Sequence, residues 1–231
     1  MSIEKPQGNH KVSVVICTLN EERNLPFVIP KIPVWVDEVI IVDAHSTDKT
    51  VESALRLRPD IKIIYQPREG KGDAMKYGIE QASGDIVAML DADGQNNPED
   101  IGELIKPLFN GYDFAKGSRL AKGRPNDMLF HRWLGNTAIA LTCNMLYRTK
   151  FTDLCSGYNA FWRESFLAIN PWAKENWGYE PLFIARVLRA KLKITEVPHG
   201  YTKRMNGKSN LPNLKQGLTA IMVLFRERFR G

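Results

Sequence analysis

The feature that most constrains this chain is a short apolar run that ends in two closely spaced aspartates. Residues 86–90 read Ile-Val-Ala-Met-Leu, and Asp91, Asp93 and Gln95 follow at every second position. A run of this length, bounded by a polar turn, predicts a strand that is buried on both faces. Two carboxylates and a carboxamide therefore lie at the end of a buried strand, which in open α/β sheets is the edge where ligands bind.

The paired carboxylates repel each other, and their burial is costly unless a cation compensates the charge. A hard divalent cation with oxygen ligands, Mg²⁺ or Mn²⁺, suits such a set, and it commonly keeps phosphate oxygens of a substrate as further ligands. An Asp-x-Asp sequence alone is too short to separate a metal site from an acidic loop. The rest of the chain has to decide between these two interpretations.

Apolar segments that predict strands alternate with segments that predict helices. Helices are expected from Glu21, with Asn20 as its cap, near residues 48–57, from about residue 71, and from Pro98, with Asn97 as its cap. This alternation predicts an α/β fold with a mostly parallel sheet flanked by helices on both faces. The other strands are expected at residues 12–17, 38–43, 61–65 and 112–116.

Polar side chains follow three of the predicted strands where each ends, and parallel strands end at one edge of a sheet, so these sets should converge. A nucleotide fits there: Asp43 could accept hydrogen bonds from a ribose or base, and a metal at Asp91 and Asp93 could bridge a diphosphate. The backbone around Lys71 could also approach the ligand, although a plain turn is the simpler explanation of residues 70–72. The three sets are Thr18, Asn20 and Glu21; Asp43, Ser46 and Asp48; and Asp91, Asp93 and Gln95.

Charge is unevenly distributed along the chain, whose net charge is +6. From Arg186 to the end, eleven basic residues face two acidic ones, a net charge of +9 that leaves −3 for residues 1–185. Such a segment either is a solvated basic surface or binds anions: phosphates, acidic lipid or nucleic acid. The signatures of common RNA-binding modules and zinc fingers are absent, which argues against a nucleic-acid-binding protein.

The three cysteines are far apart and odd in number, a pattern that provides neither a disulfide framework nor metal-ligand spacing. This favours a reducing compartment. The sequence shows no signal peptide and no apolar run near the roughly 20 residues that span a bilayer. We therefore expect a cytoplasmic protein built as one domain, residues 1–231.

Four stretches together resemble the nucleotide-sugar half of inverting family-two glycosyltransferases, which have the GT-A fold. Farther along, residues 132–136, 152–158 and 204–209 are similar to the dolichyl- and polyprenyl-phosphate hexosyl synthases. The second stretch departs from the usual Asp-Asp-Gly-Ser, because it reads Asp43-Ala44-His45-Ser46; this keeps Asp43 as a nucleotide contact and leaves the base open. The four stretches are VSVVICTLNEE, IIVDAHSTDKT, GKGDAMKYGIEQASGDIVAMLDADGQ and KGSR.

The resemblance covers about residues 12–210 and implies a nucleotide-sugar-binding half at about 12–118 and an acceptor-binding half at about 119–231. It implies that Asp91, Asp93 and Gln95 hold Mg²⁺ or Mn²⁺ against the diphosphate of GDP-mannose or UDP-glucose. Arginine suits phosphate oxygens, and the resemblance gives it that role at three positions. Arg119 and Arg132 would hold the acceptor phosphate, and Arg204 would add charge near both phosphates. The catalytic set would be Asp93 and these three arginines. The donor site would be lined by Thr18, Asn20, Glu21, Asp43, Lys71 and Asp91.

The acceptor determines the mechanism. A phosphate monoester, with a second pKa of about 6, is largely ionised at neutral pH and can attack the anomeric carbon without a general base. Attack opposite the leaving nucleoside diphosphate would invert that centre, and a metal would stabilise the charge of the leaving group. A sugar hydroxyl as acceptor would instead need a base, for which Asp153 or Glu180 is the candidate. Glu180 could equally cap a helix over residues 181–190.

Two segments, residues 133–147 and 214–229, have apolar side chains at helical spacing, and basic residues crowd the end of the second. Either they pack on the core, or they lie apolar face down on a membrane and present a lipid acceptor. Related enzymes sometimes carry spanning helices after the catalytic domain, and this sequence shows none. We therefore expect peripheral binding to the cytoplasmic membrane face, or a separate membrane-anchoring partner.

Overall fold

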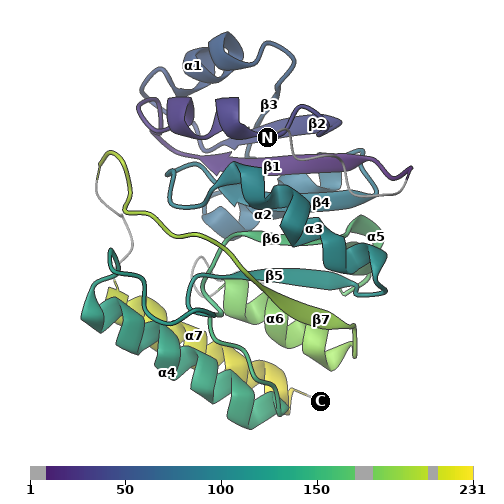
Figure 1. Cartoon of the computed structure of the whole chain (residues 1–231), viewed down its shortest axis with the longest axis vertical. Helices are drawn as coiled ribbons and strands as arrows, with labels where there is room; N and C mark the ends of the chain where they lie inside the picture. Colours follow the sequence, from purple (N-terminus) through teal and green to yellow (C-terminus); the bar gives the residue numbers. More distant parts are fainter. Residues whose placement is uncertain (1–8, 170–178, 208–212, 231) are drawn as a thin grey trace.

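A seven-stranded sheet forms the centre of the computed structural model, which describes residues 9–169, 179–207 and 213–230 (Figure 1). The strand order is β3-β2-β1-β4-β6-β5-β7. All neighbouring pairs are parallel except the two that involve β6, which runs antiparallel to β4 and β5. The strands are β1 (Val12–Thr18), β2 (Glu38–Asp43), β3 (Lys62–Tyr65), β4 (Ile86–Asp91), β5 (Phe114–Ser118), β6 (Asn159–Trp162) and β7 (Ile194–Pro198).

The register of the central strands brings the predicted polar sets together. Thr18 of β1 pairs with Asp43 of β2, and Cys17 pairs with Asp91 of β4. Because these strands are parallel, their polar carboxyl ends meet at one edge of the sheet. The predicted α/β fold with a mostly parallel sheet is confirmed, and β1, β2 and β4 are enclosed on both faces as expected.

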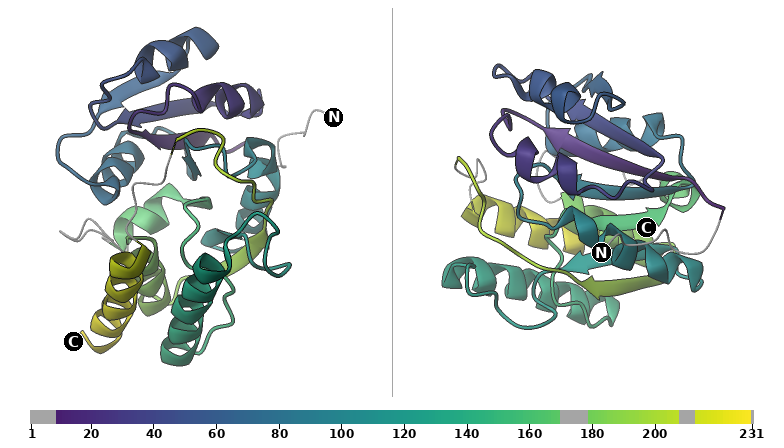
Figure 2. Two further views of the ribbon diagram at one scale, coloured as in Figure 1. Left: turned by 90° about the vertical axis from the view of Figure 1, so that its left-hand side faces the viewer. Right: turned by 45° about the horizontal axis from the view of Figure 1, so that its top comes forward.

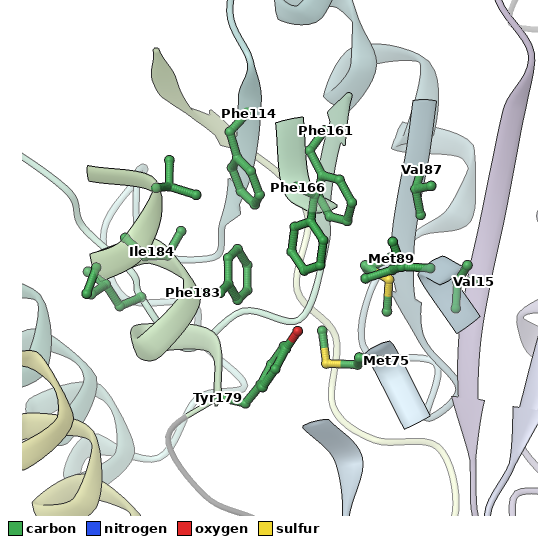
Figure 3. Close-up of a cluster of buried hydrophobic side chains, with 14 of the residues drawn as sticks. Val15, Met75, Val87, Met89, Phe114, Phe161, Phe166, Tyr179, Phe183 and Ile184 are labelled. Carbon is green, nitrogen blue, oxygen red and sulfur yellow. The ribbon is translucent and has the colours of Figure 1, made fainter. Parts of the chain in front are cut away.

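Helices cover both faces of this sheet, and each face has its own apolar core. One core includes Val15, Met89, Phe114 and Phe161 of the sheet and the side chains that cover them from α2 and α6, seen in Figure 3. The opposite core holds alternate side chains of the same strands, such as Val14 and Leu90, against α1 and α3. The helices are α1 (Thr50–Leu57), α2 (Lys71–Gln81), α3 (Ile101–Phe109), α4 (Phe130–Tyr147), α5 (Arg163–Ala168), α6 (Tyr179–Arg189) and α7 (Asn213–Phe229).

The helix expected from Glu21 is not formed. Asn20 has a left-handed backbone with φ 56°, and two short 3-10 turns, Leu25–Phe27 and Ile29–Lys31, follow instead. Each turn contains a proline, which lacks the backbone N–H that a continuing helix requires. The chain therefore crosses from β1 to β2 as a compact loop that packs Leu25, Val28 and Ile29 into the core.

The two amphipathic segments of the second half form α4 and α7, which lie side by side beyond the β7 edge of the sheet (Figures 1 and 2). They also pack on the core, through Ile139, Ala140 and Cys143 of α4 and Ala220 and Leu224 of α7. Within the described residues, no helix is long and apolar enough to cross a membrane.

Candidate functional site

Asp91, at the end of β4, lies in a cluster of charged side chains from three elements. Lys71 at the start of α2 places its Nζ 2.9 Å from Asp91 Oδ1 and 2.9 Å from Glu180 Oε1 on α6. Burial alone would raise the pKa of Asp91, but Lys71, with help from Arg119 and Asn96, lowers it. Lys71 thus enters the site by its side chain, whereas the sequence led us to expect its backbone.

Asp93 is less well compensated. Its carboxylate lies 3.5 Å from Nη1 of Arg204, whose Nη2 is 2.5 Å from Glu21 Oε1. Burial, followed by the negative charge of Asp91, raises the pKa of Asp93 to about 6. A cation between these two carboxylates would remove that penalty.

Gln95 lies in the loop after β4, beside the segment that follows β7. Its backbone N–H donates to Asp93 Oδ1 at 3.1 Å, and its Nε2 donates to the hydroxyl of Tyr201 at 2.9 Å. The amide oxygen accepts no hydrogen bond from any described residue, which leaves it available to a cation. Asp91, Asp93 and Gln95 therefore offer an all-oxygen donor set that fits Mg²⁺ or Mn²⁺.

This oxygen set needs the Gln95 amide. Among the described residues, no group of three or more His, Cys, Asp and Glu side chains could hold a metal ion. The backbone of Gly157 lies directly against the Asp91 carboxylate, because a Cβ on Gly157 would be 2.5 Å from Asp91 Oδ2. Any larger residue at position 157 would displace this carboxylate.

The ends of β1 and β2 are joined by hydrogen bonds around Asp43, which is 1% exposed. Its carboxylate accepts from the Thr18 hydroxyl at 2.9 Å and from Ser46, at 2.8 Å from the backbone N and 2.6 Å from the hydroxyl. Three acceptor positions of Asp43 are therefore already used to shape the loop. His45, in the same loop with φ 58°, stacks on the exposed ring of Tyr65, with ring centroids 5.6 Å apart.

Asn20 and Glu21 also build this edge. The side-chain oxygen of Asn20 accepts from the backbone of Thr47 at 2.8 Å, and the backbone of Glu21 donates to Thr50 at 2.8 Å. The Glu21 carboxylate then accepts from Asn24 and Arg204. Through Arg204, Glu21 in the loop after β1 is linked to Asp93, so the three polar sets do converge.

Arg119 follows β5 and pairs with Asp153, whose side chain is fully buried. Two parallel hydrogen bonds join them, 2.6 Å from Nε and 2.9 Å from Nη2. Burial opposes ionisation of Asp153, but Arg119 outweighs it and holds the pKa of that carboxyl well below its ordinary value. Asp153 is therefore a poor general base, and it orients a guanidinium whose Nη1 makes no hydrogen bond to a described residue.

Arg132 is not hydrogen-bonded to this pair. Arg132 lies in the first turn of α4, half-buried, and its side chain makes no hydrogen bond or ion pair with a described residue. Arg204, in contrast, contacts Asp93 directly. Lys208 and Ser209, which completed the last stretch of the resemblance, lie outside the described residues.

Tyr201 is the site residue that sequence reasoning missed. It contacts Gln95 through its hydroxyl, and its ring centroid lies 6.0 Å from Cζ of Arg119. It therefore joins the loop of paired carboxylates to the arginine after β5. Its position three residues before Arg204 was the only signal in the sequence.

A profile comparison matches residues 13–169 to the glycosyl transferase family 2. Glycosyltransferase AglJ of Haloferax volcanii is 31% identical over 93% of this chain and 71% of its own length. Dolichol-phosphate mannosyltransferase of Pyrococcus furiosus is 33% identical over 87% of this chain, which spans 59% of that relative. A shorter match, 36% identical over 53% of this chain and 40% of the relative, is the undecaprenyl-phosphate 4-deoxy-4-formamido-L-arabinose transferase of Photorhabdus laumondii.

Among solved structures, the chain is similar to glucosyl-3-phosphoglycerate synthase from Mycobacterium tuberculosis in complex with Mn²⁺, UDP-glucose and phosphoglyceric acid. The TM-score is 0.77 at 26% identity, and the alignment covers 95% of this chain and 80% of the other. The region that matches the family model includes β2, β4 and all but the first residue of β1, and with them the paired carboxylates at the end of β4. The chain belongs to glycosyl transferase family 2, and its fold is that of the GT-A glycosyltransferases.

Proposed function

We propose that this chain transfers a hexose, mannose or glucose, from GDP or UDP to the phosphate of a polyprenyl or dolichyl lipid with inversion. The observation that carries the proposal is the contact of Tyr201 with both Gln95 and Arg119. Tyr201 thereby connects two groups: the oxygen set of Asp91, Asp93 and Gln95, which suits a divalent cation, and the Arg119 guanidinium, which suits a second phosphate. One site can therefore bind a nucleoside diphosphate sugar and a phosphate acceptor together.

The donor half binds the nucleotide and its diphosphate. The exposed His45–Tyr65 stack offers a flat aromatic surface beside Asp43, where a base can lie. The acceptor position that remains on Asp43 Oδ2 would then receive a ribose hydroxyl. Asp91, Asp93 and Gln95 would hold Mg²⁺ or Mn²⁺, which when bound neutralises charge on the leaving diphosphate. Relatives support this assignment, since the similar synthase of known structure binds Mn²⁺ and UDP-glucose.

The acceptor half holds the nucleophile. Arg119 donates from its unused Nη1 to the acceptor phosphate, and Arg132 and Arg204 add positive charge around it. A phosphate oxygen forms the new bond to the anomeric carbon as the bond to the nucleoside diphosphate breaks, and the diphosphate keeps the electron pair. No general base is required, which agrees with the commitment of the Asp153 carboxylate to Arg119.

The names of two relatives, a dolichol-phosphate mannosyltransferase and an undecaprenyl-phosphate 4-deoxy-4-formamido-L-arabinose transferase, support a lipid-phosphate acceptor. Transfer to a sugar hydroxyl is the alternative. Glu180 would then be the base, because Lys71 Nζ contacts both Glu180 and Asp91 and so places Glu180 at the site. In this alternative Lys71 would have to leave Glu180, since its ammonium occupies the carboxylate oxygen Oε1.

The experiment is a transfer assay in detergent with Mg²⁺ or Mn²⁺. It crosses GDP-mannose, UDP-glucose and UDP-N-acetylglucosamine with polyprenyl phosphate. Metal-dependent label in the lipid phase with one donor, absent in Asp93→Ala, is the expected result. Donor hydrolysis without a lipid product would reject the lipid acceptor and direct attention to sugar acceptors and Glu180. Normal transfer by Asp93→Ala at saturating metal would reject the metal assignment.

A further inference from the structure

Tyr201 lies on the segment that follows β7 and crosses the loop after β4. Two hydrogen bonds fasten the crossing point: Thr202 donates from its backbone to the Gln95 carbonyl at 3.1 Å and from its hydroxyl to the Gly94 carbonyl at 3.0 Å. Gly94 has φ 74°, a backbone conformation that glycine adopts without strain. Tyr201 is therefore held at a fixed place beside the loop that carries Asp93 and Gln95.

The amide of Gln95 has one orientation in this setting. Its Nε2 donates to the Tyr201 hydroxyl at 2.9 Å and approaches the Thr202 carbonyl oxygen at 3.5 Å. A carbonyl oxygen can only accept, so the branch of the amide that faces Thr202 must be the nitrogen. The other branch, the oxygen, is left without a hydrogen bond from any described residue.

The ring of Tyr201 has a second neighbour. Its centroid lies 6.0 Å from Cζ of Arg119, within the range where a guanidinium is attracted to the face of an aromatic ring. Asp153 holds the Nε and Nη2 side of the same guanidinium. The Arg119 guanidinium is therefore hydrogen-bonded to Asp153 and also contacts the ring of Tyr201.

We propose that Tyr201 is a positioning residue with two separable parts. Its hydroxyl fixes the Gln95 amide so that the amide oxygen is presented to the divalent cation, and its ring keeps Arg119 in place for the acceptor phosphate. Groups that orient a metal ligand from behind commonly change metal affinity when they are removed. This inference rests on the proposed function for the identity of the cation and the acceptor.

The two parts are tested by two substitutions. Tyr201→Phe keeps the ring and removes the hydroxyl, and Tyr201→Leu removes both. The first readout is Mn²⁺ affinity by titration calorimetry, in the presence of whichever of UDP or GDP the wild-type protein binds. The second is the KM for polyprenyl phosphate in detergent. Tyr112→Phe, at an exposed tyrosine after α3, is the matched control.

We expect Tyr201→Phe to weaken Mn²⁺ binding by about tenfold with little change in the acceptor KM. Tyr201→Leu should weaken Mn²⁺ binding similarly and also raise the acceptor KM by about fivefold. Unchanged Mn²⁺ affinity in Tyr201→Phe overturns the role of the hydroxyl, and an unchanged acceptor KM in Tyr201→Leu overturns the role of the ring. Failure of the wild-type protein to bind Mn²⁺ would instead reject the metal site of the proposed function.

Discussion

At the scale of single residues, the Arg119–Asp153 pair separates the two mechanisms. The carboxylate is fully buried and its pKa is held low by the guanidinium, although burial opposes ionisation. A base must accept a proton in the transition state, and a carboxylate with a lowered pKa does this poorly. The pair instead holds a guanidinium in a fixed orientation. This arrangement suits the phosphate acceptor of the proposed function better than a hydroxyl acceptor.

Asp153→Asn tests this assignment because it keeps the shape of the side chain and removes the charge. We expect the acceptor KM to rise while kcat at saturation changes less than about tenfold, since no proton passes through residue 153. Steady-state kinetics with the acceptor varied measures both values. A fall in kcat of about 10²–10⁴ would identify Asp153 as a base and contradict the assignment. Stability should also fall, because Arg119 loses its buried counter-charge.

His199 gives the fold a dependence on pH. Burial, together with the positive charge of Arg119, lowers the pKa of His199 to about 4, and its Nε2 lies 3.1 Å from the Ser156 hydroxyl. In the unfolded chain His199 takes up a proton near pH 6.5, whereas in the folded chain it does so only near pH 4. This contribution to stability is complete above pH 6.5 and is lost as the pH falls toward 4.

We expect the wild-type protein to lose more stability between pH 7.5 and pH 5 than His199→Gln, whose amide can replace the contact with Ser156 without titrating. Urea midpoints at the two pH values measure this difference, and groups common to both proteins cancel. The exposed His131→Gln is the control and should behave as the wild type. An equal loss in His199→Gln would show that His199 is not the group responsible.

At the scale of elements, the first five strands along the chain could be predicted, whereas β6 and β7 could not. β1, β2 and β4 were expected within a residue or so of their observed bounds, because each carries a continuous apolar run. β6 has four residues and pairs antiparallel with β4 and β5, so it lies between two strands that precede it in the sequence. Such pairing depends on distant residues, which local pattern does not reveal.

The same limit applies to the site. Asp91, Asp93, Gln95 and Asp43 could be placed because they end predictable strands. Lys71 and Arg204 were also expected at the site, but the sequence did not indicate that they pair with these carboxylates, and Tyr201 was not expected there at all. All three residues reach the carboxylate loop from segments distant in sequence, and local pattern carries no signal for such contacts.

Gly78 tests how closely α2 approaches the sheet, and Gly135 of α4 is the open position for comparison. A Cβ on Gly78 would lie 2.5 Å from Val15 Cγ1 and 2.7 Å from Val42 Cγ2, so Gly78→Ala should destabilise by about 1–3 kcal/mol through overpacking. Gly135 lies within α4 with no neighbour within 4 Å of its Cβ position, so Gly135→Ala should stabilise by about 0.5–1 kcal/mol. Urea unfolding measures both changes. Equal effects at the two positions would contradict this account of the packing.

α4 and α7 carry a surface that supports the proposed work at a membrane. Large apolar side chains remain exposed at helical spacing on both neighbouring helices, and Met145 and Met222 are 75% and 62% exposed. α4 has no acidic residue, and the only one in α7, Glu227, is buried against Arg186 and Arg189. An apolar face on two helices that expose basic but no acidic side chains suits a bilayer that contains anionic lipid. The exposed apolar residues of the two helices are Phe130, Leu134, Leu141, Met145, Leu218, Met222, Phe225 and Phe229.

Met145→Glu with Met222→Glu should weaken binding to vesicles of phosphatidylglycerol and phosphatidylcholine by about tenfold or more, since apolar burial is replaced by charge repulsion. Flotation of vesicles without any substrate measures this. Val34→Glu, which changes an apolar residue 92% exposed elsewhere on the molecule, is the matched control. No binding by the wild-type protein would contradict direct association and favour a separate anchoring partner.

At the scale of the whole molecule, the site joins segments that the chain supplies far apart. β1 and β2 shape the loops around Asp43, β4 brings the paired carboxylates, and the segment after β7 returns across them with Tyr201 and Arg204. Two of the positive charges at the carboxylates, Lys71 and Arg204, belong to different parts of the fold. A bound cation would neutralise Asp91 and Asp93 in place of Lys71 and Arg204. Because these residues come from different parts of the fold, binding of the cation and a diphosphate should raise the stability of the whole fold rather than of one loop.

This argument gives a prediction for ligand and metal removal. Mn²⁺ together with the bound nucleoside diphosphate, UDP or GDP, should raise the melting temperature, and EDTA should reverse the rise. At a ligand concentration about 100 times its Kd the stabilisation is about 2.7 kcal/mol, or roughly 5–10 °C for a chain of this size. Differential scanning fluorimetry of the protein with each component alone and with both measures the effect.

Asp93 decides whether the rise comes from the assigned site. Asp93→Ala should remove the joint effect of Mn²⁺ and nucleotide, because the pair of carboxylates no longer exists to hold the cation. By itself it should raise the melting temperature of the metal-free protein at pH 7.5, since an ionised Asp93 with a pKa of about 6 costs stability there. Asp127→Ala, at an exposed aspartate, is the control and should change neither. A full rise with nucleotide in EDTA, or an undiminished rise in Asp93→Ala, would contradict a divalent cation held between β4 and the diphosphate.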